Sequence, residues 1–125
     1  MEAEHVTQRY DDDCGVAAFA TIARKTYEEA DEIMKDVRQH KTRFILHRNM
    51  KFKLIQIGLL DINSSYSKKF LAEKGDAIIY ARHTDGYWHY ITFIGGVFYD
   101  PNKGQPSSKL DNKLIPSVVY NVDYN

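Results

Sequence analysis

A lone cysteine at the start of an apolar segment is the first candidate nucleophile in the chain. Cys14 is followed by Gly15, which leaves room for an approaching carbonyl group, and residues 15–25 are apolar almost all round, as in a buried helix. A thiol at a helix start faces unpaired N–H groups and the positive end of the helix dipole, which favour the thiolate. The carboxylates of Asp11–Asp13 oppose it. On these facts alone, inert packing is the more common role of such a cysteine.

A candidate general base comes from the geometry of a predicted β-hairpin in the second half of the chain. Gly95–Gly96 is a two-residue turn pattern, and a turn there pairs Ile91 with Asp100. Because side chains alternate along a strand, His89 and Asp100 then share a face as diagonal neighbours, with Cβ atoms about 7–8 Å apart or less. An aspartate at that range can fix the ring and tautomer of a catalytic histidine. A His–Asp pair that only stabilises the hairpin is the alternative.

An amide side chain precedes the cysteine by six residues. Gln8 in that place can donate to a developing oxyanion, alongside the Cys14 backbone N–H. Nucleophile, base, orienting carboxylate and oxyanion donor together are the parts that covalent catalysis of acyl transfer needs.

These motifs resemble those of the papain-like cysteine peptidase superfamily, and specifically the bacterial peptidase domains that remove double-glycine leaders from bacteriocin precursors, with their stand-alone relatives. The matching segments are Gln8, Asp13–Ala18, Trp88–Ile91 and Tyr99–Asn102. The family orders its site residues as Gln, Cys, His and Asp, which is the order found here. The resemblance covers the whole chain in layout, whereas its specific motifs account for about 20 residues.

The resemblance implies a role for each matched residue. Cys14 would be the nucleophile, His89 its base, Asp100 the residue that orients His89, and Gln8 an oxyanion-hole donor. The leader peptidases are usually joined to a transporter, and no such segment is present in this sequence, so a double-glycine substrate does not follow. The Cys-Gly-Ser-Cys-Trp signature of papain is also absent, so the likeness to papain itself is one of fold and mechanism.

The function expected is a cysteine peptidase or amidase that works through an acyl-enzyme. The same triad also runs deamidation and acyl transfer, so an effector or toxin domain acting on a protein target is one alternative. A non-catalytic relative that binds a peptide is another, and the Asp11–Asp13 run favours it.

The predicted fold is α+β and papain-like, with residues 1–125 as one domain. The first helix covers residues 15–25. Thr26 and Glu29 have the spacing of a capping box that starts a second helix, and a third helix is expected over about 50–60. Short β-branched and aromatic runs then predict an antiparallel sheet. These runs are Ala77–Ala81, Trp88–Ile94, Val97–Asp100 and Ser117–Val122.

Composition limits the partners. The 125 residues include 17 basic and 17 acidic side chains, so no net charge favours nucleic acid or an anionic membrane. Residues 1–36 have an excess of acids and residues 37–82 an excess of bases, which predicts that these segments neutralise each other. The alternative is a basic binding surface formed by Lys41, Arg43, Arg48, Lys51 and Lys53.

One cysteine cannot form an internal disulfide, so the chain needs no oxidising compartment. No apolar run approaches the roughly 18 residues of a membrane span, and the N-terminus lacks a signal-peptide pattern. We expect a cytoplasmic protein, or a domain delivered as an effector by other machinery. The expected partners are a peptide or protein substrate and, beyond it, an immunity or transport protein. No cofactor or metal is expected, because His5, His47, His83 and Asp85 form no closed ligand set.

Overall fold

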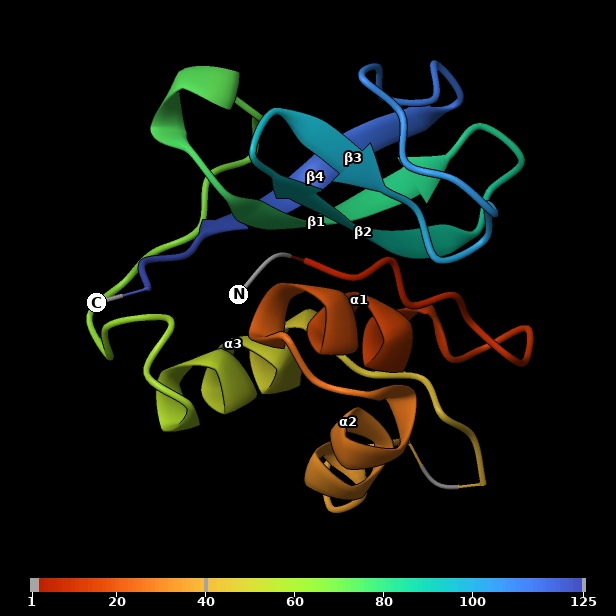
Figure 1. The fold of residues 1–125 in the computed structure, drawn as a ribbon, viewed down its shortest axis with the longest axis vertical. Coiled ribbons are helices and arrows are strands. Elements are labelled where there is room, and N and C mark those ends of the chain that lie inside the picture. The colour runs from red at the N-terminus through yellow and green to blue at the C-terminus, as the bar shows by residue number, and fades with distance from the viewer. Residues whose placement is uncertain (1–2, 40, 125) are drawn as a thin grey trace.

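The computed structural model describes residues 3–39 and 41–124, and it shows an α+β arrangement with a helical layer packed against an antiparallel sheet (Figure 1). The described helices are α1 (Cys14–Ala23), α2 (Tyr27–Met34), α3 (His47–Gln56) and a short 3₁₀ helix, η1 (Ala72–Lys74). The described strands are β1 (Ala77–His83), β2 (Trp88–Ile94), β3 (Val97–Tyr99) and β4 (Leu114–Asn121), in the order β3-β2-β1-β4. The coarse α+β prediction is therefore confirmed.

Helix α1 is the buried centre of the molecule, as its uniformly apolar sequence predicts. Every residue from Cys14 to Ile22 is buried, and α1 packs against both α2 and β2. Arg24 caps the end of the helix and adopts a left-handed conformation with φ of 59°. The capping box that opens α2 is confirmed, since the Thr26 side chain accepts from the Glu29 N–H and the Glu29 side chain accepts from the Thr26 N–H.

The hairpin between β2 and β3 has the predicted register. Thr92 pairs with Tyr99 and Phe93 with Phe98, so Gly95 and Gly96 form the turn, both at positive φ. The two faces of the sheet differ in what covers them. One packs against the helices through residues such as Tyr90, while the other forms a second apolar cluster covered by Phe70 and Leu110.

Several element boundaries differ from the predictions. Helix α1 ends at Ala23 rather than at residue 25, and β1 continues to His83 instead of ending at Ala81. Helix α3 begins at His47 rather than near residue 50, and β4 begins at Leu114 rather than Ser117. The sequence pattern missed the start of β4 because it contains Pro116, which an edge strand tolerates, and because the pairing shifts between Tyr80 and Ala81. Across residues 3–39 and 41–124, no helix combines the length and the apolar character needed to cross a bilayer.

The segment before α1 runs between the two layers (Figure 1). Its Val6 N–H donates to the Thr21 hydroxyl on α1, at 3.1 Å. On the other side its Gln8 N–H donates to the Pro101 carbonyl in the loop after β3, at 2.9 Å. This segment therefore joins the helix that carries Cys14 to the loop that carries Asp100.

Candidate active site

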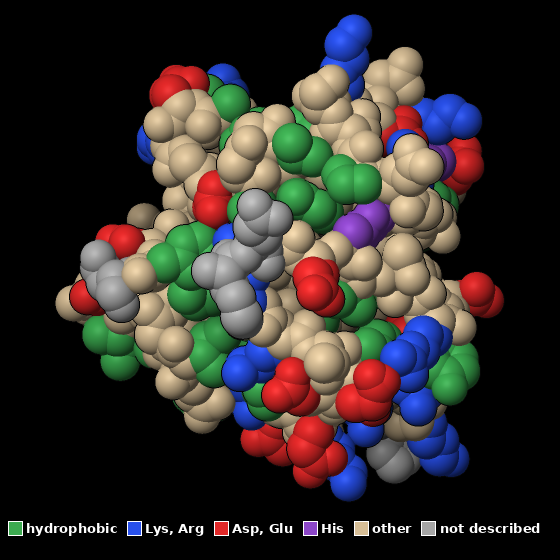
Figure 2. All heavy atoms as spheres, viewed as in Figure 1, with side chains coloured by type: hydrophobic (Ala, Val, Ile, Leu, Met, Phe, Trp, Pro, Cys, Tyr) green, Lys and Arg blue, Asp and Glu red, His purple; other side chains and the backbone are tan. Residues whose placement is uncertain are grey.

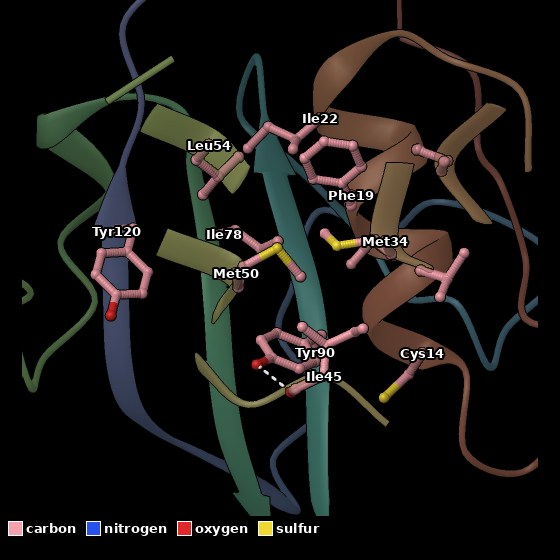
Figure 3. Close-up of a cluster of buried hydrophobic side chains, with 14 of the residues drawn as sticks. Cys14, Phe19, Ile22, Met34, Ile45, Met50, Leu54, Ile78, Tyr90 and Tyr120 are labelled. Atoms are coloured by element: carbon pink, nitrogen blue, oxygen red, sulfur yellow. Dashed lines mark hydrogen bonds between the residues drawn. The ribbon is translucent and has the colours of Figure 1, made fainter. Parts of the chain in front are cut away.

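Cys14 is the first residue of α1 and is only 4% exposed. Figure 3 shows its sulfur directed away from the helix, on the side of β2. Gly15, the next residue, has a packing role in addition to the space for a carbonyl that the sequence suggested. It is buried, and a Cβ atom there would lie 3.2 Å from both Ile45 and Tyr90, whose hydroxyl donates to the Ile45 carbonyl (Figure 3). Glycine is needed because the helix start sits so close to this pair.

The first turn of α1 keeps its backbone N–H groups available. Asp13 occupies the N-cap position, but its carboxylate makes no capping bond to the helix. It accepts instead from the Arg9 and Tyr10 N–H groups, at 2.9 and 3.0 Å, and from the Tyr27 hydroxyl, at 2.6 Å. The first N–H groups of a helix have no intrahelical acceptor, so the one on Cys14 can serve an oxyanion.

The structure gives the three consecutive aspartates three different surroundings. Asp13 is fully buried among the donors just described. Asp12 accepts from the Arg43 N–H at 3.1 Å, on the side of the segment away from Cys14. Only Asp11 shares a cleft with Cys14. Hydrogen bonds therefore compensate Asp12 and Asp13, and Asp11 is the one of the three that lines the cleft of Cys14.

His89 and Asp100 are in direct contact. The Nε2 atom of His89 lies 2.5 Å from an Asp100 carboxylate oxygen, and both residues are buried. The same oxygen accepts from the Asn102 N–H at 2.9 Å. With Nε2 engaged by Asp100, Nδ1 is the ring nitrogen left for Cys14. The diagonal contact predicted from the hairpin register is confirmed.

The pair is strongly polarised. Burial lowers the pKa of His89, but hydrogen bonds to Asp100 and Cys14 and the negative charges of both groups outweigh burial and raise that pKa to about 9. Burial works to raise the pKa of Asp100, yet the hydrogen bond and charge of His89 bring it below its usual value. His89 is therefore an imidazolium at neutral pH when Cys14 is a thiolate beside it.

Gln8, the residue predicted as an oxyanion donor, lies in the segment before α1. Its side chain lines the same cleft as Cys14 and His89. One N–H of the amide donates to the Tyr10 carbonyl at 2.7 Å, and the amide oxygen is buried without a hydrogen-bond partner among the described residues. Because a primary amide has two N–H donors, the second stays available to a ligand in the cleft.

The cleft over these groups has a volume of about 270 Å³. Its lining residues are Gln8, Asp11, Cys14, Tyr87, Trp88, His89 and Asn102. A space of this size accommodates one or two side chains rather than a large cofactor, since typical ligand pockets run to about 300–1,000 Å³. A polypeptide segment crossing it would present a backbone carbonyl to Cys14.

Sequence reasoning missed two residues that hold Asp100. Asn102 completes an Asx turn, and the Asp-x-Asn spacing could have indicated it. His5 was set aside as a scattered histidine, yet its Nε2 donates to the Asp100 carbonyl at 2.8 Å and its ring packs edge-on against Tyr99. No local pattern links residues so far apart in sequence. A larger cavity of about 690 Å³ beside His5 is not lined by Cys14, His89 or Asp100.

Several other residues singled out in the sequence lie away from the cleft and make structural contacts. Lys53 is buried and pairs with Asp36 at 2.8 Å, so the suggested basic surface is wrong at that residue. Arg43 packs over the Tyr10 ring instead. His83 contacts Asp85 at the far side of Tyr87. In the part of the chain that the structure describes, no three His, Cys, Asp or Glu residues gather as metal ligands.

Comparison with protein-family models gives no match for this chain, and comparison with curated proteins gives no significant match either. A thiol at a helix start, a carboxylate-held imidazole and two N–H donors facing one cleft can together attack a carbonyl and hold the resulting oxyanion.

Proposed function

We propose that this chain is a papain-like cysteine hydrolase that cleaves a peptide or amide bond through an acyl-enzyme. The observation that carries the proposal is the convergence on one cleft of Cys14, at the start of buried α1, and His89, held by Asp100. The order of elements, with the thiol helix first and the His–Asp hairpin later, supports the papain-like assignment.

Cys14, His89 and Gln8 each have a role in the proposed acylation and deacylation steps. The Cys14 thiolate adds to the carbonyl carbon, and the oxyanion accepts from the Gln8 amide and the Cys14 N–H. The His89 imidazolium gives its Nδ1 proton to the leaving nitrogen as the C–N bond breaks, which leaves an acyl-thioester. Neutral His89 then takes a proton from water, whose oxygen adds to the thioester carbon. Expulsion of the thiolate releases the acid, and the imidazolium is restored.

The decisive test is the reactivity of Cys14. A neighbouring imidazolium favours the ionised form of a thiol, whereas only a few per cent of a free thiol is ionised at neutral pH. We expect iodoacetamide to alkylate Cys14 about tenfold faster than a model thiol at neutral pH, and His89→Ala to remove that advantage. Rates are measured by intact-mass spectrometry, with circular dichroism to confirm that the variant is folded. A slow rate that His89→Ala leaves unchanged would contradict the proposal.

Turnover separates hydrolysis from related acyl chemistry. Peptides with small residues before the target bond are incubated with wild type and with Cys14→Ala, and the products are identified by mass spectrometry. Hydrolysis yields two fragments, deamidation leaves an intact chain with an acid in place of an amide, and acyl transfer adds a group. We expect fragments with wild type and none with Cys14→Ala.

A further inference from the structure

The candidate cleft has two chemically different walls. One comes from the segment before α1 and the helix start, and it presents Gln8, Asp11 and Cys14. The other comes from the start of β2 and the residue before it, and it presents two large rings, with Tyr87 47% and Trp88 42% exposed. A substrate side chain entering the cleft would lie between a carboxylate and an aromatic surface.

Asp11 is the only carboxylate among the cleft-lining residues that is left for a ligand. Its side chain is exposed, and within residues 3–39 and 41–124 it makes no ion pair. Its neighbours differ, because Asp12 and Asp13 are engaged by backbone N–H groups. A carboxylate that lines the cleft without an ion-pair partner can form a charge-assisted hydrogen bond with a cationic group of a ligand.

The aromatic wall is held from behind. Trp88 stacks on Tyr80, with ring centroids 4.9 Å apart and planes 8° apart, and Tyr87 stacks on His83 at 4.3 Å and 12°. Rings fixed in this way offer rigid faces on which the stem of a lysine or the guanidinium of an arginine can lie.

Acidic side chains lie around the aromatic wall, and the charge of the His89 imidazolium in the cleft is offset by Asp100. Burial raises the pKa of Tyr87, and the negative charges of Asp85, Asp100 and Asp111 raise it further. None of the residues that line the cleft is a lysine or an arginine. Lys103 already pairs with Asp111, at 3.0 Å.

We propose that Asp11 is a specificity-determining residue, which makes the cleft select a lysine or arginine side chain beside the bond that Cys14 attacks. This inference rests on the proposed function and names its substrate class. The cationic head would pair with Asp11 while its stem packs on Tyr87 and Trp88. An acidic side chain would meet like charge and be rejected.

The field at Cys14 can be measured without knowing the substrate. Two methanethiosulfonate reagents of similar size, one carrying trimethylammonium and one carrying sulfonate, are reacted with Cys14, and each rate is divided by that for free cysteine. We expect Asp11→Asn to lower the ratio of cationic to anionic rates about fivefold. Glu73→Gln is the matched control, because it removes one exposed carboxylate from η1, before the start of β1 and away from the cleft. It should leave the ratio unchanged.

Peptides test the substrate class directly. Lysine, glutamine or glutamate is placed in turn at each position around the cleaved bond, and kcat/KM is measured for wild type and Asp11→Asn. At one position we expect the lysine peptide to exceed the glutamine peptide about fivefold in wild type, and the two to become equal in Asp11→Asn. The glutamate peptide should be the slowest for wild type.

The outcomes separate this inference from the proposed function. If Cys14 is no more reactive than a model thiol and is insensitive to His89→Ala, the proposed function fails. If Cys14 is reactive but Asp11→Asn leaves the reagent ratio unchanged, only the role of Asp11 is overturned. A reagent ratio that falls while no position prefers lysine overturns the substrate class.

Discussion

At the scale of single residues, the contact between His89 and Asp100 is the part of the site that the sequence predicts best. A two-residue turn fixes the hairpin register, and the register decides which side chains share a face. The positions of Gln8 and Asp11 in the cleft were less accessible from the sequence, because both residues lie in a segment without periodic structure. Only the fold shows that the Asp13 carboxylate accepts from the Arg9 and Tyr10 N–H groups, whereas Asp11 lines the cleft with Cys14.

The Asp100 carboxylate should control the alkaline side of the activity profile. Its charge helps to raise the pKa of His89 to about 9, so the imidazolium that protonates the leaving group is lost as pH rises through that value. Asp100→Asn keeps an acceptor but removes the charge. We expect the fall in kcat/KM to start at lower pH, with a loss of about tenfold at about pH 8.5.

Asp111→Asn is the control for that measurement. Asp111 carries the same charge nearby, pairs with Lys103 and makes no contact with His89. Its substitution should leave the profile of kcat/KM against pH in place. Superimposable profiles for wild type and Asp100→Asn would show that the carboxylate does not control His89.

At the scale of elements, the site depends on three pieces that meet: the start of α1, the β2–β3 hairpin and the segment before α1. The first two have patterns that the sequence reveals, namely an apolar run and a turn flanked by alternating residues. The third is tied down by contacts with residues far away in sequence, such as the bond from His5 to the Asp100 carbonyl. Such contacts leave no local pattern, so the segment could not be placed before the fold was known.

His5 should therefore act as a positioning residue for Asp100. His5→Leu removes the donor to the Asp100 carbonyl but keeps an apolar side chain against Tyr99. We expect a loss of about tenfold in kcat/KM, with the alkaline fall displaced to lower pH as in Asp100→Asn. His5→Gln can place an amide N–H near the original Nε2, so it should restore most of the rate.

A purely structural role for His5 gives a different result. His5→Leu and His5→Gln would then lower the midpoint of urea unfolding without moving the pH profile of the folded enzyme. Measuring both properties on both variants separates the two roles.

At the scale of the whole molecule, the uneven charge of the sequence is resolved by contacts between its segments. Asp31 pairs with Arg38 at 2.7 Å and Asp36 with Lys53 at 2.8 Å, which joins the acidic and basic stretches as predicted. Figure 2 shows acidic and basic side chains intermixed over the helical layer. The α+β class and most elements followed from local patterns, whereas the pairing of β4 required the bulge between Tyr80 and Ala81 that no pattern marks.

His89, Tyr80 and Tyr90 predict how the free energy of unfolding depends on pH. His89 has a folded pKa of about 9 against an ordinary 6.5, so its contribution is fully present below about pH 6.5 and is lost as pH rises through about 9. The loss is about 3 kcal/mol, a large share of a total of about 5–15 kcal/mol. Burial, aided by the charge of Cys14, likewise raises the pKa of Tyr80 to about 12, and burial also raises that of Tyr90. Their contributions are complete below about pH 10, and that of Tyr80 is lost as pH rises through about 12.

Urea unfolding followed by far-ultraviolet circular dichroism from neutral to strongly alkaline pH should therefore show two falls in stability. The first belongs to the ion pair of the site and the second to the buried tyrosines of the core. His89→Gln retains a side chain able to hydrogen-bond Asp100 but does not titrate, so it should abolish the first fall and keep the second. Tyr80→Phe should weaken only the second, because the ring remains stacked on Trp88 while the titrating hydroxyl is gone. A first fall that persists in His89→Gln would mean that His89 is not the group that links stability to pH in this range.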